Sequence, residues 1–113
     1  MKKLTFIFIL LLALSACKNE NAETNIPPDV IPREKMQNIL VDMQLVEGAL
    51  IYERSQGGVS DSLRDYYFNR VFEKYAISSK QYDKSLNFYK DHLKLFDEMY
   101  NQVIKDLESL ENQ

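Results

Sequence analysis

The stretch that decides the fold is the last third of the chain, residues 78–113, SSKQYDKSLNFYKDHLKLFDEMYNQVIKDLESLENQ. It opens with an S-x-x-Q capping box formed by Ser78 and Gln81, a pattern typical of a helix N-terminus. No glycine or proline follows, and apolar side chains recur alternately four and three residues apart, which is the seam of a heptad repeat. The seam consists of Tyr82, Leu86, Tyr89, Leu93, Phe96, Tyr100, Val103, Leu107 and Leu110. The spacing predicts one long amphipathic helix over residues 79–113, either straight or kinked near Asp91–Leu93.

Two further helices are expected before this one. The first covers about residues 33–55, because apolar residues recur there at helical spacing, and Gly57-Gly58 ends it. Its apolar face consists of Met36, Ile39, Leu40, Met43, Val46, Leu50 and Ile51. The next start signal is Ser60-Asp61-Ser62, in which Ser62 and Asp65 form a capping-box pattern, and that helix should end near Ala76. Since no strand pattern is present, the expected fold is all-α, a small up-down bundle of three helices with a long third helix.

The first residues have the pattern of a secretion signal. Lys2 and Lys3 precede an apolar run over residues 4–14, which is shorter than the about 20 residues that a membrane span needs. Leu14-Ser15-Ala16-Cys17 then resembles the lipobox of bacterial lipoproteins, in which the peptide is cut before a cysteine that carries diacylglyceryl and N-acyl groups. The resemblance implies that Cys17 is the lipidated first residue of the mature chain; an ordinary secretory signal is the alternative. Because Cys17 is the only cysteine, its lipidation leaves no thiol for a disulfide, a metal or catalysis.

Three segments follow from this pattern: a signal peptide over residues 1–16 that is removed, a lipidated cysteine and tether over 17–31, and a helical domain over 32–113. A protein that carries two or more acyl chains is held firmly on a membrane. We therefore expect the protein in the cell envelope, anchored in the outer membrane. The sequence does not decide between the periplasmic face and the surface face of that membrane.

Removal of the signal leaves 12 basic against 17 acidic residues, and this acidic balance argues against nucleic acid as a partner.

Several stretches of the domain resemble a family of small lipoproteins from Bacteroidota known as domain of unknown function 4296. These stretches are IPREKM (31–36), ILVDMQLVE (39–47), YAIS (75–78), YDKSL (82–86), FY (88–89) and YNQV (100–103). The resemblance covers nearly all of the chain after Cys17 and implies an envelope lipoprotein, but it supplies no activity to carry over. Family members often have a proline near the position of Leu93, so the leucine leaves open whether the long helix breaks there.

The chain contains no familiar catalytic set. His92 is the only histidine, so a Ser–His–Asp or Cys–His site would have to use it, and a solvated or helix-capping role is expected instead. No sequence motif of a calcium, zinc or phosphate site occurs. We therefore expect no enzymatic activity, no metal and no cofactor apart from the covalent lipid on Cys17.

One charged residue breaks the helical pattern. Glu47 falls inside the apolar stripe of the first helix, and burying a carboxylate is costly unless it is paired or hydrogen-bonded. Glu47 is therefore expected to form a buried polar clamp, with Arg54 or tyrosine hydroxyls as partners. The alternative is a ligand- or partner-binding acid with a raised pKa. Asp42, at the edge of the stripe, is expected to be solvated and is the second candidate for such a site.

Tyr52 and Tyr66 fall beside the apolar stripes, where partner contact and edge packing are equally expected.

The expected function is that of a lipid-anchored envelope protein, a non-catalytic interaction or assembly module that docks on another envelope protein. Two alternatives remain: a small-ligand-binding protein that uses the Glu47 region, and a chaperone-like periplasmic protein that uses the amphipathic third helix.

Overall fold

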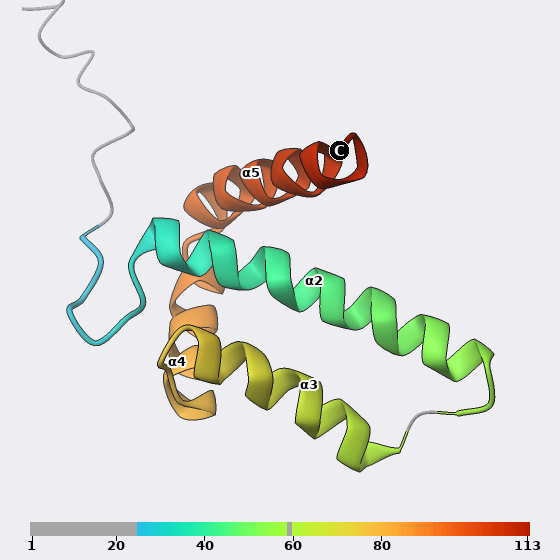
Figure 1. The fold of residues 1–113 in the computed structure, drawn as a ribbon. Helices are drawn as coiled ribbons and strands as arrows, with labels where there is room; N and C mark the ends of the chain where they lie inside the picture. The colour runs from blue at the N-terminus through green and yellow to red at the C-terminus, as the bar shows by residue number, and fades with distance from the viewer. Residues whose placement is uncertain (1–24, 59) are drawn as a thin grey trace, which may run out of the picture.

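The computed structural model describes residues 25–58 and 60–113. These residues form no strand and four helices, α2 (Arg33–Ser55), α3 (Asp61–Lys74), α4 (Ser79–Lys90) and α5 (Leu93–Glu111) (Figure 1). The all-α class is therefore confirmed. The predicted count of three helices is wrong, because the segment expected to be one long third helix forms α4 and α5.

Asp91 and His92 separate α4 from α5. The backbone of His92 leaves the helical region, with φ −121° and ψ 73°. Its Nδ1 lies 2.7 Å from the carbonyl oxygen of Phe88 and donates to it, since a carbonyl can only accept. The imidazole also stacks on the Phe88 ring, with 4.3 Å between ring centroids. Leu93, which the heptad seam placed in the core, is 75% exposed, so the buried seam does not continue through the break.

Serine hydroxyls cap α3 and α4. The Ser78 Oγ accepts from the backbone N–H of Gln81 at 3.0 Å, which confirms the predicted start of α4. The Ser60 Oγ accepts from the N–H of Leu63 at 3.1 Å. The N-cap of α3 is therefore Ser60, the first residue of the predicted start signal, and Ser62, the serine of the expected capping box, lies inside the first turn.

The helix ends of α2 and α3 depend on left-handed backbone. Gly57 and Gly58 follow α2 with φ of 136° and 124°, a region that glycine adopts without steric cost. After α3, Ala76 has a φ of 52°. The N–H of Ile77 then donates to the carbonyl of Phe72 at 3.0 Å, a helix-closing bond that turns the chain toward α4.

The helices are arranged around α2. Asp42 contacts Lys74 and Glu47 contacts Arg64, so α2 and α3 form an antiparallel hairpin. The helix α4 lies at one end of this hairpin, and α5 then runs along another side of α2 (Figure 1).

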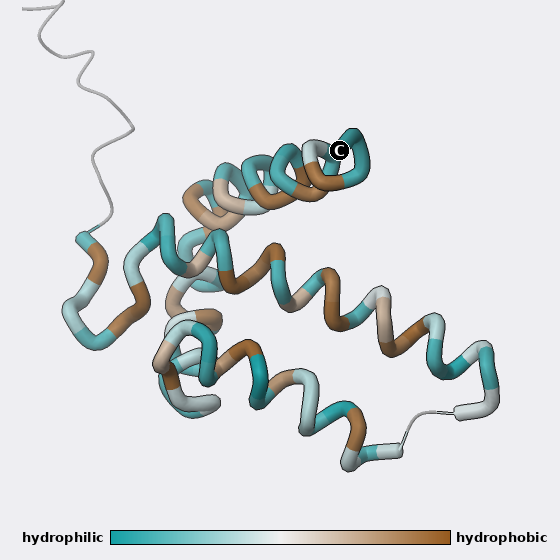
Figure 2. Tube along the Cα trace, in the orientation of Figure 1, coloured by the Kyte–Doolittle hydropathy of each residue, from teal (hydrophilic) through white to brown (hydrophobic). Residues whose placement is uncertain are grey.

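The core lies where the first half of α2 meets α4 and α5. Its fully buried members include Met36, Ile39, Tyr89, Met99 and Val103. Figure 2 shows hydrophobic residues recurring along α2 and along the edge of α5 nearest to it. Each such side chain contributes about 1.5–3 kcal/mol to stability by its burial. Farther along α2, Ile51 was expected on the buried face but is exposed. The apolar face of α2 is wider than the part of it that the neighbouring helices cover.

Candidate functional site

The predicted lipidation site, Cys17, lies outside the described residues, as do the signal peptide over 1–16 and the first part of the tether. The described chain begins at Asn25. What the structure shows of the predicted tether is therefore how its last residues join the helical domain.

The end of the tether is fixed by two side chains of α4. The backbone N–H of Ile31 donates to the Ser85 Oγ at 2.9 Å. The Tyr89 hydroxyl donates to the carbonyl oxygen of Ile31 at 2.5 Å. Ser85 and Tyr89 are four residues apart and so face the same side of α4. All three residues are fully buried, and burial raises the pKa of the Tyr89 hydroxyl. We call Ile31, Ser85 and Tyr89 the tether clamp.

A turn on the surface precedes the tether clamp. The N–H of Val30 donates to the carbonyl of Pro27 at 3.1 Å, and the Val30 side chain is buried. Asp29 pairs with Lys84 of α4, and the hydrogen bond from Lys84 lowers the pKa of the Asp29 carboxyl. Residues 27–31 therefore pack on the domain, and Pro32 forms the N-cap of α2.

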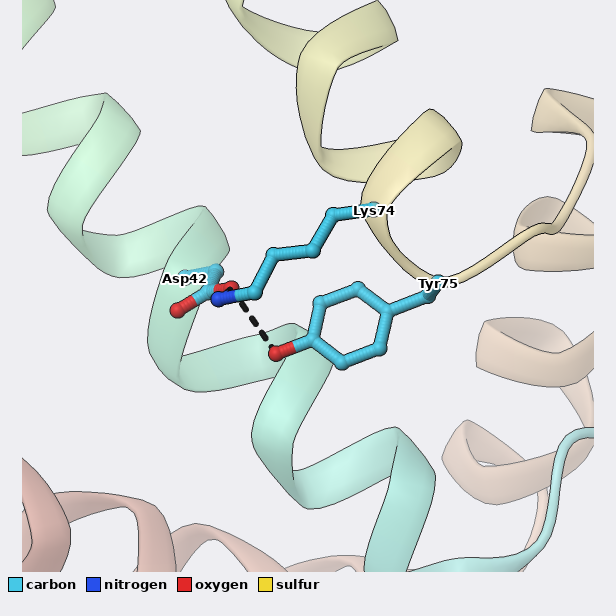
Figure 3. Close-up of polar contacts among 3 residues, drawn as sticks. All are labelled: Asp42, Lys74 and Tyr75. Carbon is cyan, nitrogen blue, oxygen red and sulfur yellow. Dashed lines mark hydrogen bonds and ion pairs between the residues drawn. The ribbon is translucent and has the colours of Figure 1, made fainter.

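A polar cluster joins α2 to the end of α3 (Figure 3). One carboxylate oxygen of Asp42 accepts from the Lys74 ammonium at 2.7 Å and from the Tyr75 hydroxyl at 2.8 Å. The hydrogen bond with Asp42 raises the pKa of Lys74. Burial, followed by the hydrogen bond to Asp42, raises the pKa of Tyr75. The Asp42 side chain is 21% exposed, so the expectation that it is solvated is wrong.

Glu47 does not form the buried clamp expected of it. Its side chain is 46% exposed, and its Oε1 lies 4.0 Å from Arg64 of α3 rather than beside Arg54. Arg54 is exposed in the last turn of α2. The burial expected for Glu47 is absent because its position lies at the edge of the contact with α3. Of the two acids, Asp42 is the one that takes part in a clamp between helices.

An open groove of about 600 Å³ lies between α2 and α3. Its lining residues are Asp42, Leu45, Val46, Tyr67, Arg70, Val71, Glu73 and Lys74. Leu45 is half exposed, and Tyr52, one heptad further along α2, is exposed on the same face. Tyr66 is also exposed, and its ring contacts that of Tyr67 edge-on with 5.7 Å between centroids. We call this surface the α2–α3 groove.

His92 lies at the helix-capping position between α4 and α5. Helix capping is one of the two roles that the sequence predicts for this residue.

Among residues 25–58 and 60–113, no three His, Cys, Asp or Glu side chains are placed together to hold a metal ion. None of the helices in this described part combines the length and apolarity that a membrane span requires.

Sequence reasoning missed two parts of this arrangement. Ser85 carried no signal, because a serine in a helix is usually solvent-facing; only its spacing of four from Tyr89 on one face could have suggested a role. The groove was also missed, because it depends on how α3 is set against α2.

Comparison with known families gives one match. The sequence matches the family described as "Domain of unknown function (DUF4296)" over residues 27–113. No curated protein and no solved structure matches the chain.

Proposed function

The chain belongs to the family defined by domain of unknown function 4296, and from its own residues we propose that it is a lipid-anchored protein of the cell envelope. In this proposal its helical domain is a non-catalytic interaction module. The domain docks on another envelope protein through the α2–α3 groove.

The anchor is supported by the lipobox pattern that ends at Cys17, and the tether clamp fixes where the chain after that residue joins the domain. Lipidation would attach the chain to a membrane through Cys17, and residues 27–31 are packed against α4. Only about nine residues then separate the lipid from the packed segment, and nine residues reach at most about 32 Å even when fully extended. The domain would therefore act within a few tens of ångströms of the membrane surface.

The α2–α3 groove is the observation that carries the interaction role. Its floor is apolar, with Val46 and Val71, and its rim consists of the half-exposed Leu45 and the partly buried Tyr67. Accessible aliphatic and tyrosine side chains around a groove between two helices are typical of a surface that receives a third, amphipathic helix.

The charged residues of the groove indicate which chemical groups a partner should present to it. Lys74 is already bonded to Asp42 at one end of the groove. Arg70 is one of the lining residues, and a guanidinium can form a bidentate bond with a carboxylate. We propose that the partner presents an amphipathic helix whose apolar face meets Leu45 and Val46 and whose edge carries an aspartate or glutamate for Arg70.

The test is affinity capture of the full-length chain from detergent-solubilised envelope membranes of the native bacterium. The wild-type chain should retain one stoichiometric partner, and Leu45→Asp and Arg70→Glu should each reduce its recovery at least tenfold. Ile51→Asp is the matched control, because Ile51 is an exposed apolar residue of the same helix that does not line the groove. Recovery that is equal for all four chains, or capture of no partner by the wild-type chain, contradicts the proposal.

The small-ligand alternative has weaker support. Glu47 is half exposed and lies 4.0 Å from Arg64 at the surface, whereas a residue that binds a small ligand is expected to line an enclosed pocket.

A further inference from the structure

The helix α3 is the least completely packed helix of the domain. The fully buried side chains come from Ile31 and from α2, α4 and α5, and none of them comes from α3. Val71 is the one buried residue of α3, and it keeps 7% of its surface exposed. An element with few buried contacts can open at a lower free-energy cost than the whole fold.

The contacts of α3 are concentrated around its last turn. There one carboxylate oxygen of Asp42 accepts from both Lys74 and Tyr75. The ring of Phe72 also contacts that of Tyr82 in α4, with 5.5 Å between centroids. The end of α3 is therefore fixed both to α2 and to α4.

The first turns of α3 face a part of α2 that lies outside the main core. Leu50 is buried in this part of α2 but does not belong to the core cluster, and α3 is the helix beside it (Figure 1). The ion pair here joins Glu47 to Arg64 at 4.0 Å, and both side chains are about half exposed. An exposed pair of this kind adds little stability.

The turn after α3 stores backbone strain at Ala76. The N–H of Ala76 donates to the carbonyl of Glu73 at 3.1 Å, and the N–H of Ile77 donates to that of Phe72 at 3.0 Å, which are the two bonds of a Schellman motif. Glycine usually occupies this position, because the φ of 52° found at Ala76 crowds a Cβ atom. The strain is released when the end of α3 unwinds.

We propose that α3 is a lid on α2, which opens as one unit while α4, α5 and the first half of α2 stay folded. Asp42 is the latch that holds the lid closed. Because α3 has 14 residues, and an isolated helix of this length is marginally stable in water, α3 unwinds when it opens.

The lid determines whether the α2–α3 groove is present. Tyr67, Arg70, Val71 and Lys74 of α3 line the groove, so opening of the lid removes one of its walls. A partner that needs both walls binds only the closed lid, and its apparent affinity falls with the fraction of chains that are open. This consequence rests on the proposed function. The lid itself is tested on the chain alone, so a failure to find a partner and a failure of the lid are separate results.

The first test is native-state hydrogen exchange of the full mature chain in a monodisperse detergent, at urea concentrations below the unfolding transition. The amides of Tyr67, Phe68 and Val71 should share one opening, with protection at least about tenfold lower than that of Ile39 and Val103 in the core. Urea should speed their exchange with a shallower dependence than in the core, because the opening exposes less surface. Equal protection in α3 and in the core overturns the proposal, as does exchange in α3 that does not respond to urea.

Two variants separate the lid from the rest of the fold. Tyr89→Phe weakens the tether clamp, which stays intact when the lid is open. It should speed exchange in the core at least about fivefold and leave exchange in α3 unchanged within about twofold. Asp42→Ala removes the latch, which is lost in the open and the unfolded chain alike, so it should speed exchange in α3 and in the core by the same factor, at least about fivefold. If Tyr89→Phe speeds exchange in α3 as much as in the core, α3 opens only with the whole domain and the proposal is overturned.

Ala76→Gly tests the strain in the turn after α3 with a variant that favours the observed backbone. Glycine adopts a left-handed conformation without steric cost, so the closed lid becomes more stable and exchange in α3 should slow at least about twofold. Faster exchange in α3 would contradict a release of strain on opening.

Discussion

The hydroxyl of Tyr89 donates a hydrogen bond of 2.5 Å to the carbonyl oxygen of Ile31, 58 residues earlier in the chain. Together with the bond from the Ile31 N–H to Ser85, it satisfies both backbone polar groups of the residue at which the tether enters the core. Buried backbone groups are nearly always satisfied in this way. Here side chains do so, because residues 25–31 lie in no helix or strand.

Removal of the Tyr89 hydroxyl should lower the free energy of unfolding. Tyr89→Phe keeps the ring in the core but removes the donor of this buried carbonyl, and leaving a buried acceptor without its partner costs about 1–3 kcal/mol. Urea denaturation measures the change. Tyr52→Phe is the matched control at an exposed position, with an expected change within about 0.5 kcal/mol. Equal effects at the two positions would show that the bond to Ile31 adds nothing.

Ser85→Ala should act on the same unit. It leaves the buried N–H of Ile31 without its acceptor, with a cost of about 1–3 kcal/mol. Because both bonds hold one residue in place, we expect the double variant with Tyr89→Phe to lose less than the sum of the two single losses. A double-mutant cycle by urea denaturation gives the coupling energy, and strict additivity would contradict a shared clamp.

The cluster at Asp42 should make stability depend on pH in the alkaline range. The pKa of Lys74 is raised from its ordinary 10.5, and that of Tyr75 from its ordinary 10.0. Below about pH 10 both groups hold their protons in the folded and unfolded states, so their contribution is fully present. As pH rises further, the unfolded chain releases its protons first, and the free energy of unfolding falls until the folded groups also titrate.

Urea denaturation between pH 8 and 11.5 measures this dependence, with the variant Asp42→Asn as the comparison. The variant lacks the carboxylate charge that favours protonated Lys74 and Tyr75, so its stability should fall less steeply above pH 10. Parallel curves for the two chains would show that the cluster contributes nothing to the pH dependence.

Asp42→Ala and Glu47→Ala should differ in their cost to stability. Asp42 is the less exposed of the two and makes two hydrogen bonds between helices, so its loss should cost about 1–2 kcal/mol. The half-exposed pair of Glu47 and Arg64 should contribute at most about 1 kcal/mol. Thermal or urea unfolding of the two variants decides the order, and a larger loss for Glu47→Ala would reinstate the buried clamp predicted from the sequence.

The break between α4 and α5 predicts that Leu93 is dispensable for the fold. Because it is 75% exposed, Leu93→Ala should change the free energy of unfolding, measured by urea denaturation, by less than about 0.5 kcal/mol. A buried seam position would lose about 2–5 kcal/mol. Leu40→Ala, at a buried position of α2, is the control that should show such a loss.

The sequence was most informative where local chemistry decides the structure. The hydrogen bond between Ser78 and Gln81 sets the start of α4 regardless of what the helix packs against. Gly57 and Gly58 end α2 because glycine can adopt the positive φ found there. The sequence indicated Asp91–Leu93 as the place of a kink but did not decide whether the helix ends there, because the apolar period continues through it. In the structure α4 ends before Asp91, and the His92 Nδ1 donates to the carbonyl oxygen of Phe88.

The polar contacts depended on tertiary placement. Asp42 and Glu47 are both acids near one helical stripe, and only the position of the end of α3 makes Asp42 the bonded one and leaves Glu47 half exposed. Ser85 gave no signal beyond its spacing of four from Tyr89, because its partner is a backbone group 54 residues away. Tyr52 and Tyr66 are exposed as their positions beside the stripes suggested, and their contact with a partner stays a prediction.

The lipid anchor at Cys17 is the central claim, and mass spectrometry of the mature N-terminal peptide tests it most directly. The protein should be isolated from envelope membranes of its native host and digested with trypsin. We predict a first residue at Cys17 that carries a diacylglyceryl thioether and an amide-linked acyl chain. A chain that keeps residues 1–16, or one whose Cys17 thiol is free, would contradict the claim.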